Sequence, residues 1–294
     1  MSQHFEAKEN TAGAVRRIAH AELDEALRLL SDQAQPVSDA VHETRKKIKR
    51  LRALLRLVRG SLGAEYRNLN SALRKAAGRL SVAREAAAAL EALDGLAEKR
   101  PGQLSGARIA EARKFLSREL PENRDAMAEL YALASAELDA IGQRVARIDF
   151  AGEGWPPLEG GVRAGYRRAR RRLAHASNHL DLETFHELRK AVKAHQYQLQ
   201  LFEPAFEELI KARREVVAAL AELLGEHHDL ALLGPSMVRH GFEDVAAAAY
   251  ERSAELEQRI LRAGRRLFAE RPQYFTATLG AWFEDFRAWG PTAT

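Results

Sequence analysis

Two segments of this chain, 144 residues apart, resemble each other and so constrain its architecture. Residues 41–58 read VHETRKKIKRLRALLRLV, residues 185–202 read FHELRKAVKAHQYQLQLF, and seven of the eighteen positions are identical. The same shift lays residues 80–85 on residues 224–229 without a gap. Such an internal repeat predicts two similar halves, whereas the alternative is a chance similarity between two segments rich in lysine and arginine.

The first segment forms an amphipathic helix when its residues are placed at about 100° per residue. The apolar side holds Val41, Thr44, Ile48, Leu51, Leu55 and Val58, and the opposite side holds His42, Arg45, Lys46, Lys49, Arg52 and Arg56. Glu43 is the only acid in the segment. Like charges one turn apart cost roughly 0.2–0.5 kcal/mol per pair, a cost that an anionic ligand would relieve. We therefore predict an anion-binding surface, against the alternative of a merely solvated basic face.

The composition favours helices over sheets. Hydrophobic residues make up 46% of the 294 residues, enough to bury a core, and aromatic residues make up only 7%. The absence of cysteine excludes disulfides, thiolate metal sites and cysteine nucleophiles. From this composition we expect an all-α protein. Since the sequence has neither a signal-peptide pattern at its N-terminus nor a run of about eighteen apolar residues, we expect it in the cytoplasm.

Proline and glycine separate the helical patterns along the chain. The clearest boundary is residues 149–161, DFAGEGWPPLEGG, with four glycines and two prolines. It divides the chain into residues 1–150 and 151–294, and we predict that each half is a bundle of about four helices, with a basic cleft between them, together forming one domain. In the first half, the predicted helices lie at about 14–30, 41–58 with Ser38 or Asp39 as N-cap, 65–99, and 105–148 with an interruption at Pro121. In the second half, they lie at about 181–203 with Asp181 as N-cap, then in a further helix that ends at Leu233 before the break at Gly234-Pro235, and at 242–289 with a break near Pro272.

Both repeated segments match a known motif. The motif has the form V/L-H-x-x-R-x-x-x-K/R-R-L-R, followed one helix later by L-G-x-x-R/H-D. The first copy is filled by His42, Arg45, Lys49, Arg50, Leu51 and Arg52, and the second by His186, Arg189, Lys193 and Tyr197. In this the sequence resembles the CHAD domain family, named for conserved histidines on α-helices, over nearly its whole length.

The resemblance implies a duplicated pair of four-helix bundles that binds inorganic polyphosphate, often at cytoplasmic polyphosphate granules, with no catalysis assigned and no cofactor. Granule-associated proteins are a further class of partner that it implies. Three positions depart from the motif: Ala194 and Gln196 stand where the second copy is usually basic, and Glu85 replaces the first aspartate. We therefore expect weaker anion binding by the second half, unless Lys190 and the arginines at 167–172 compensate.

The candidate binding residues are cations because arginine forks onto two phosphate oxygens and lysine adds a mobile point charge. The candidate polyphosphate-binding residues are His42, Arg45, Lys46, Lys49, Arg50, Arg52, Arg56, His186, Arg189, Lys190, Lys193 and Tyr197. The candidate secondary anion-binding residues are Arg16, Arg17, Lys75, Arg79, Arg167, Arg168, Arg171 and Arg214. Tyr197 is the only aromatic residue on the two basic strips, which disfavours nucleic acid because nucleobases stack on aromatic rings.

Several histidines allow more than one interpretation. His42 and His186 each begin a basic strip, where they could donate to phosphate or simply support the start of the helix. His227, His228 and Asp229 resemble part of a metal-dependent phosphohydrolase site, which His186 could join. Adjacent helical residues point about 100° apart, however, so we predict no metal site and a polar contact between helices at His228. For His195 we predict a buried position in the core.

The basic strips together with the resemblance therefore imply a polyphosphate-binding protein that is not an enzyme. It contains no phosphate-binding glycine loop with its lysine and no nucleophile elbow. Two alternatives stay open: a metal-dependent polyphosphatase or triphosphatase, and an adaptor that binds nucleic acid or another polyanion.

Overall fold

A computed structural model describes residues 3–32, 34–119 and 127–291 of the protein. These residues form helices and no β-strand, which confirms the predicted all-α class. Two short 3-10 helices, Ser117–Glu119 and Glu203–Ala205, accompany the α-helices. In chain order the α-helices are α1 Thr11–Ser31, α2 Val37–Leu57, α3 Arg59–Leu62, α4 Ala64–Arg79, α5 Ser81–Lys99, α6 Gly106–Leu116, α7 Ala128–Val145, α8 Pro156–Ala176, α9 Leu182–Leu201, α10 Glu207–Arg239, α11 Glu243–Leu267 and α12 Pro272–Trp289.

Side-chain caps and prolines explain where several helices begin. The side chain of Asn10 accepts a hydrogen bond from Gly13 N at 2.9 Å, and that of Asp181 accepts from Thr184 N at 2.8 Å, as predicted for α9. Pro156 and Pro272 open α8 and α12, where the missing N–H has no helical partner in any case. The prediction of Ser38 or Asp39 as the N-cap of α2 is wrong, because that helix already begins after Pro36.

Three predicted boundaries are wrong, in each case because packing overrides local preference. The region predicted as one helix at 65–99 divides at Leu80, a fully buried residue between α4 and α5. The predicted linker ends early, since α8 includes Gly160 and Gly161. In contrast, α10 continues through Pro235, because α11 packs along it. Pro121 lies outside the described residues.

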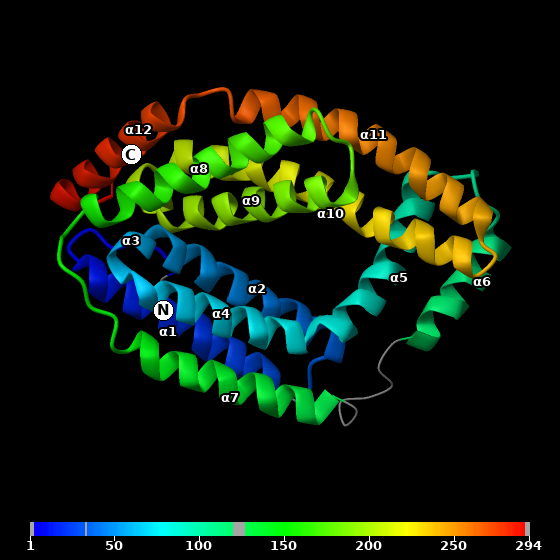
Figure 1. The fold of residues 1–294 in the computed structure, drawn as a ribbon, viewed down its shortest axis with the longest axis horizontal. Helices are drawn as coiled ribbons and strands as arrows, with labels where there is room; N and C mark the ends of the chain where they lie inside the picture. Colours follow the sequence, from blue (N-terminus) through cyan, green and yellow to red (C-terminus); the bar gives the residue numbers. More distant parts are fainter. Residues whose placement is uncertain (1–2, 33, 120–126, 292–294) are drawn as a thin grey trace.

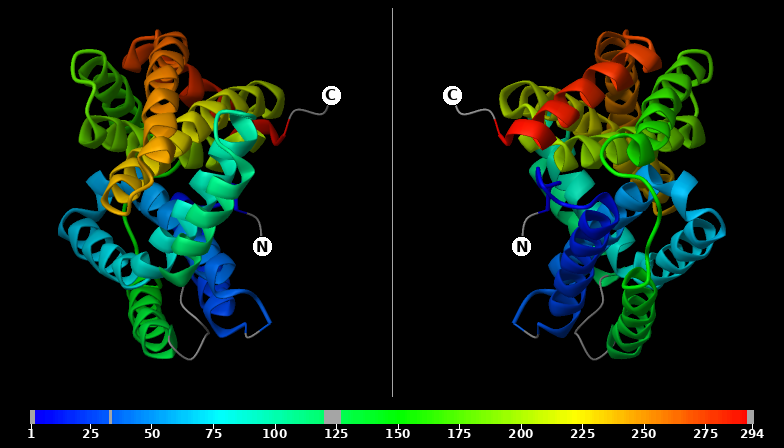
Figure 2. Two further views of the ribbon diagram at one scale, coloured as in Figure 1. Left: turned by 90° about the vertical axis from the view of Figure 1, so that its right-hand side faces the viewer. Right: turned by 90° about the vertical axis from the view of Figure 1, so that its left-hand side faces the viewer.

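The helices form two layers that meet at α2 and α9. Figure 1 shows α8 to α12 in the upper half and α1 to α4 with α7 in the lower half. α2 contacts both α8 and α9, whereas α5 reaches across to contact α10 and α11. Figure 2 shows the connection from α7 to α8 running along one side of the molecule. The second motif helix, α9, is therefore packed directly against the first, α2.

Several helices of the second half begin at a nearly constant offset from helices of the first half. α8 begins 145 residues after α1, α9 145 after α2, α10 143 after α4, and α12 144 after α7. α10 stands at the place of α4 and α5 together, as one continuous helix. This offset is the one that the sequence repeat predicts.

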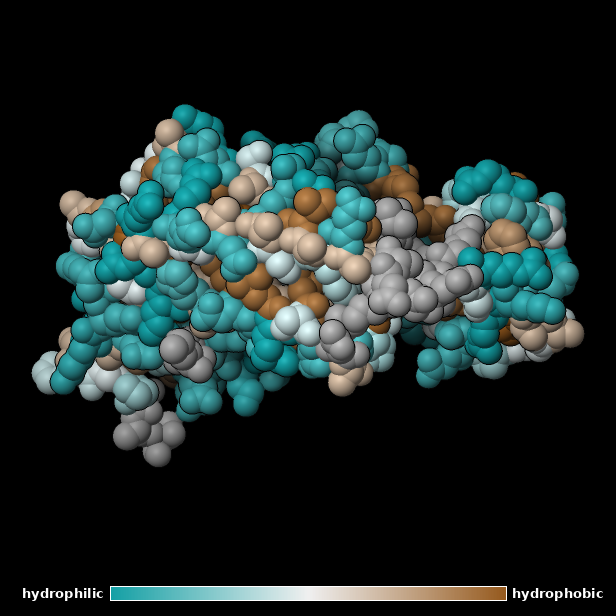
Figure 3. Space-filling view, turned by 90° about the horizontal axis from the view of Figure 1, so that it is seen from below, coloured by the Kyte–Doolittle hydropathy of each residue, from teal (hydrophilic) through white to brown (hydrophobic). Residues whose placement is uncertain are grey.

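The buried face of α2 is the one that the periodicity predicts. Val41, Thr44, Ile48, Leu51 and Leu55 are at most 1% exposed, and all five lie on the apolar side of the helix. Hydrophilic residues cover most of the face shown in Figure 3, with hydrophobic residues in a band along its middle. Among the described helices, none is both long enough and apolar enough to cross a bilayer.

Candidate functional site

The basic strips of α2 and α9 lie on helices that touch each other. The amide nitrogen of Gln198 on α9 donates to the carbonyl oxygen of Ala53 on α2 at 3.4 Å. Close by, the guanidinium of Arg50 lies 5.8 Å from the centroid of the Tyr197 ring and donates to Gln3 Oε1 at 2.9 Å. Burial raises the pKa of Tyr197, which keeps its hydroxyl neutral. The two halves of the chain therefore present their motif residues at one shared contact.

A histidine cluster, which we define as Lys49, His186, Arg189 and His228, joins α2, α9 and α10. The rings of His186 and His228 have centroids 4.5 Å apart. Burial lowers the pKa of His228 to about 3, and the charges of Arg189 and Lys49 act in the same direction. Burial likewise lowers the pKa of His186, helped by Lys190 and Arg189. Both histidines are neutral at pH 7 and stand among fixed positive charges.

Three buried nitrogen atoms of this cluster have no hydrogen-bond partner within the described residues. They are Nδ1 of His186, Nδ1 of His228 and Nε of Arg189. Arg189 also makes no ion pair with any acid in the described part of the chain. Arg189 Nε can only donate, whereas the role of each histidine Nδ1 depends on the tautomer of the neutral ring. Since buried polar groups are nearly always hydrogen-bonded, the cluster is a place where the described side chains leave hydrogen-bonding capacity unused.

An arginine cluster, which we define as Arg52, Arg56, Arg74, Arg168 and Arg172, joins α2, α4 and α8. Burial lowers the pKa of Arg52 to about 10, with Arg56 and Arg74 adding to the effect. Burial and the charge of Arg56 also lower the pKa of Arg168. Within the described ranges, neither Arg56 nor Arg74 has an ion-pair or hydrogen-bond partner, while Arg52 Nε donates to an amide oxygen at 3.0 Å. The cluster therefore concentrates positive charge from helices far apart in sequence.

The carboxylate of Glu187 partly neutralises the arginine cluster. Its Oε2 atom lies 3.2 Å from a guanidinium nitrogen of both Arg168 and Arg172, and its Oε1 atom pairs with Lys190. The three cations lower the pKa of Glu187 although burial opposes them, so it is ionised at pH 7. One negative charge shared by three cations leaves net positive charge at the surface.

A known family model matches most of the chain, including the residues of both clusters. The sequence model of the CHAD domain covers residues 14–235, which include both basic strips and the His227-His228-Asp229 segment. This chain belongs to the CHAD domain family. No curated protein sequence matches it.

Two solved structures share the fold of this CHAD domain. The CHAD domain from the plant Ricinus communis aligns with a TM-score of 0.61 and 20% identity, over 90% of this chain and 94% of that one. PptA from Streptomyces chartreusis aligns with a TM-score of 0.56 and 20% identity, over 90% of this chain and 100% of that one. At this level of identity the likeness concerns the fold.

Other predicted binding residues of this CHAD domain already hold partners within the chain. Lys46 Nζ lies 3.1 Å from Glu43 Oε2, and Lys193 Nζ lies 2.9 Å from Glu222 Oε1. Arg45 donates to the carbonyl oxygen of Ala77 on α4. These contacts fix the side chains along the strips and reduce the free charge of the strips at Lys46 and Lys193.

The predicted secondary residues are dispersed rather than gathered at one place. Only Arg168 belongs to the arginine cluster, and Arg167 and Arg171 are exposed on α8 without an ion pair among the described residues. The remaining five hold contacts that stabilise the fold: Arg16 with Ile148 O and Asp149, Arg17 with Glu9, Lys75 and Arg79 with Glu137, and Arg214 with Glu203.

The adjacent histidines of α10 point to different neighbours. His227 Nε2 lies 3.2 Å from Glu257 Oε1, and the His227 ring packs 4.5 Å from that of Phe185. His228 instead faces His186. Across the residues that the structure describes, no group of three or more histidines and carboxylates is placed to hold a metal ion. The side chain of Glu85, the departure from the motif, lies outside the described residues.

Three members of these clusters, Arg74, Arg172 and His228, are not among the candidate binding residues that the sequence predicts. Arg74 and Arg172 lie on helices whose solvent-exposed faces carry many charges, so their sequence does not distinguish them from other basic residues. Only the packing of α4 and α8 on α2 brings them close to Arg52 and Arg168. His228 drew attention as a metal ligand, and the structure places it beside His186 in the histidine cluster. The L-G-x-x-H-D pattern of residues 224–229 was the signal that could have placed it there.

Proposed function

We propose that this CHAD domain binds inorganic polyphosphate, without catalysis, where α2 packs on α9. The observation that carries the proposal is a set of cations on α2, α4 and α9, namely Arg56, Arg74 and Arg189, that have no acidic partner among the described residues. Burial and the charges of Arg56 and Arg74 also lower the pKa of Arg52 to about 10, which fits positive charge that no acid neutralises. A polyanion supplies the missing negative charge.

The spacing of the cations suits a linear ligand. His42, Arg45, Lys49, Arg52 and Arg56 follow one another along α2 at intervals of three and four residues. Such residues stand about one turn apart, so they present charges roughly every 5 Å along the helix. Phosphate groups of a chain can accept from successive side chains, and binding energy then adds up over many contacts.

A matched pair of variants tests the proposal. In the site variant, Arg52, Arg56 and Arg189 are changed to Gln, which removes three positive charges without introducing acids. In the control variant, the exposed residues Arg28, Arg113 and Arg147 are changed to Gln, which gives the same net charge away from the site. Fluorescence titration with long-chain polyphosphate at physiological salt measures Kd for each.

We expect Kd to rise at least a hundredfold in the site variant, since three charge-assisted contacts contribute on the order of 3 kcal/mol together. The control variant should stay within about threefold of the original protein, because losing charge at a distance has little effect through salt. Equal losses in the two variants would mean that net charge alone drives binding, and the proposed site would be wrong.

Two further measurements separate this function from its alternatives. Duplex DNA at equal charge concentration should fail to displace polyphosphate, because Tyr197 is the only aromatic residue on the two basic strips on which a base could stack. Phosphate release should stay at background with Mg²⁺ or Mn²⁺ present. Displacement by DNA would favour the nucleic-acid adaptor, and turnover that depends on His228 would favour the phosphohydrolase.

The location that fits this function is the cytoplasm, at polyphosphate granules. A fluorescent fusion of the full chain should gather at the granules of cells that store polyphosphate. The site variant should instead stay diffuse at the same expression level, and granule localisation of that variant would separate targeting from polyphosphate binding.

A further inference from the structure

The second half of α11 carries a group of arginines without acids. Arg259, Arg262, Arg265 and Arg266 are all exposed, and no acid occurs between Glu257 and Glu270. In the described part of the chain, none of the four makes an ion pair or a hydrogen bond. We call these four residues the α11 patch.

The first half of the same helix is different. Its acids are engaged with other elements: Glu251 and Glu255 with Arg100 at the end of α5, and Glu257 with His227 of α10. Positive and negative charge are therefore segregated along α11, with the neutralised half near α5 and the unneutralised half near the end of the helix.

Helix geometry explains only part of this pattern. Basic residues in the last turn of a helix interact favourably with its macrodipole, and this accounts for Arg265 and Arg266. The effect falls off within one turn, so it does not account for Arg259 and Arg262. Arg262 in addition has like charges three residues away on both sides, at Arg259 and Arg265, and another four residues on, at Arg266, which is unfavourable without a counter-charge.

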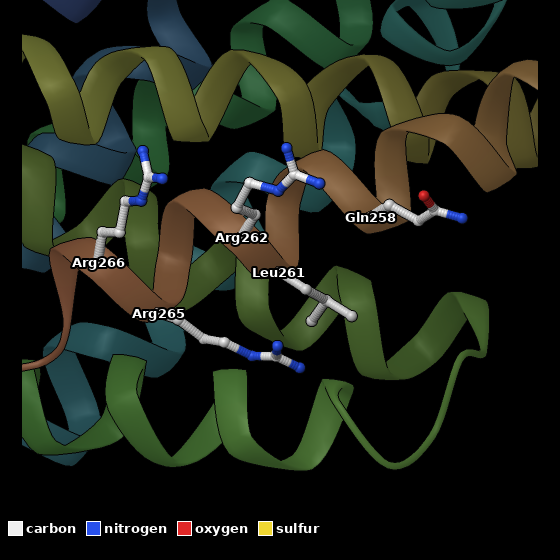
Figure 4. Close-up of a pocket in the computed structure, with 5 residues that line it drawn as sticks. All are labelled: Gln258, Leu261, Arg262, Arg265 and Arg266. Carbon is white, nitrogen blue, oxygen red and sulfur yellow. The ribbon is translucent and has the colours of Figure 1, made fainter.

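Three of these arginines line a shallow pocket. Arg262, Arg265 and Arg266, with Gln258 and Leu261, surround a volume of about 440 Å³. Figure 4 shows Arg262 and Arg266 reaching to one side of α11, one turn apart, and Arg265 reaching to the other side. A ligand that engages all three must follow the curved surface of the helix.

The α11 patch is separate from the site between α2 and α9. α11 packs against α10, α8 and α5, and the first two of these helices also contact α9. Figure 1 shows α11 along the upper edge of the molecule, whereas α2 lies in the lower half. A ligand can therefore occupy the α11 patch without entering the first site.

We propose that the α11 patch is a second binding site for a phosphate-rich chain, so that one molecule holds two segments of inorganic polyphosphate. This inference rests on the proposed function. A flexible polyanion can reach guanidinium groups on both sides of a helix, each of which can fork onto two phosphate oxygens, whereas a rigid duplex meets one side. The pocket has no aromatic residue on which a nucleobase could stack.

Two sites on one molecule have a physical consequence. Each protein molecule can join two polyphosphate chains, or hold one long chain at two places with higher apparent affinity. Mixtures of the protein with long-chain polyphosphate then form large assemblies, which a protein with a single site does not form.

The test uses the full chain and three variants of equal length. In the α11 variant, Arg262, Arg265 and Arg266 are changed to Gln, and in a lysine variant the same residues are changed to Lys. The third is the control variant, which removes the same number of charges elsewhere. Circular dichroism and thermal unfolding establish that each is folded, and the lysine variant keeps the charge of the helix end if the α11 variant does not fold.

Titration calorimetry with sodium tripolyphosphate counts the sites, and light scattering with long-chain polyphosphate detects cross-linking. We expect about two tripolyphosphate molecules per chain for the original protein and the lysine and control variants, and about one for the α11 variant. Scattering should disappear only in the α11 variant. Its slope of log K against log salt for long-chain polyphosphate should fall by about 2 to 3, since three phosphate contacts are lost.

Other outcomes overturn the inference. One tripolyphosphate per chain in the original protein and unchanged scattering in the α11 variant would refute the second site and leave the first intact. Loss of the second site in the lysine variant, which keeps the positive charges, would show that positive charge alone does not explain tripolyphosphate binding at the α11 patch. Preferential displacement from the α11 patch by duplex DNA or an acidic peptide at equal charge would refute the assigned ligand. Failure of the original protein to bind at all would instead refute the proposed function.

Discussion

The imidazole rings of His186 and His228 face each other across the contact between α9 and α10, with centroids 4.5 Å apart. Burial and neighbouring cations lower both pKa values, that of His228 to about 3. Neither ring is therefore charged at pH 7, although Arg189 and Lys49 beside them are. An anion bound among these groups reverses the local potential, so that a histidine in contact with it becomes easier to protonate.

Polyphosphate binding should therefore take up protons. Since the bound anion raises the pKa of His228, the complex holds more protons than the free protein, and affinity rises as pH falls from about 7 to 5. Calorimetry at pH 6 in two buffers of different ionisation enthalpy measures the uptake. His228→Asn should reduce it, whereas His179→Asn, at an exposed position, should not. Affinity that is independent of pH would place the phosphates elsewhere.

The arginine cluster should weaken the free protein while it strengthens the complex. Arg56→Gln relieves repulsion with Arg52 and Arg168, so the free energy of unfolding at low salt should rise by about 0.5 kcal/mol and this gain should vanish near 1 M salt. Polyphosphate affinity should fall about tenfold. Thermal unfolding and titration measure the two effects.

A paired arginine provides the control for this prediction. Arg28 Nε lies 2.8 Å from Glu25 Oε2, so Arg28→Gln removes an attraction, and the free energy of unfolding should fall slightly without any change in affinity. If Arg56→Gln lowered stability at low salt as Arg28→Gln does, the cluster would not be electrostatically frustrated.

The periodicity of the sequence predicted the helices and the buried face of α2, because both depend on residues three and four positions apart. Val41, Ile48 and Leu51 needed no knowledge of the rest of the chain. The continuation of α10 through Pro235 could not be predicted in this way, because α11 holds that helix: a Cβ on Gly234 would lie 2.6 Å from the Tyr250 ring.

The candidate site was predictable only in part for the same reason. Arg45, Arg52 and Arg189 followed from a pattern within single helices. Whether a cation is available to a ligand depends on acids from other helices. Glu137 of α7, for example, pairs with both Lys75 and Arg79 of α4. Sequence spacing carries no information on such pairs.

His195 should make the protein sensitive to acid. Its buried ring packs edge-on against the stacked rings of Tyr166 and Phe275, and burial lowers its pKa to about 3. Between pH 6.5 and 3 the unfolded state therefore binds a proton that the folded state does not, so the free energy of unfolding falls as pH falls, by roughly 1 kcal/mol per pH unit from this residue. Above pH 6.5 this contribution no longer changes.

The variant His195→Leu tests this assignment, because leucine fills the position without titrating. Urea unfolding between pH 7 and 4 should show a smaller dependence on pH than in the original protein, by about the same 1 kcal/mol per unit. His240→Leu, at an exposed position, should leave the dependence unchanged. An unaltered slope in His195→Leu would mean that His195 is charged in the folded protein or that other groups control acid unfolding.

Gly161 determines how closely α8 approaches the end of α2, and therefore how the two halves of the site meet. A Cβ at this position would overlap the carbonyl oxygen and Cα of Leu57, both backbone atoms that cannot move independently of α2. Gly161→Ala should lower the free energy of unfolding by roughly 2–3 kcal/mol, as overpacking of a core does.

Gly160 is the matched control, because it lies in the same helix and no heavy atom is within 4 Å of its Cβ position. Gly160→Ala should raise the free energy of unfolding by about 0.5–1 kcal/mol through helix propensity. Urea midpoints measure both changes, and similar effects of the two substitutions would contradict the close approach of α8 to α2.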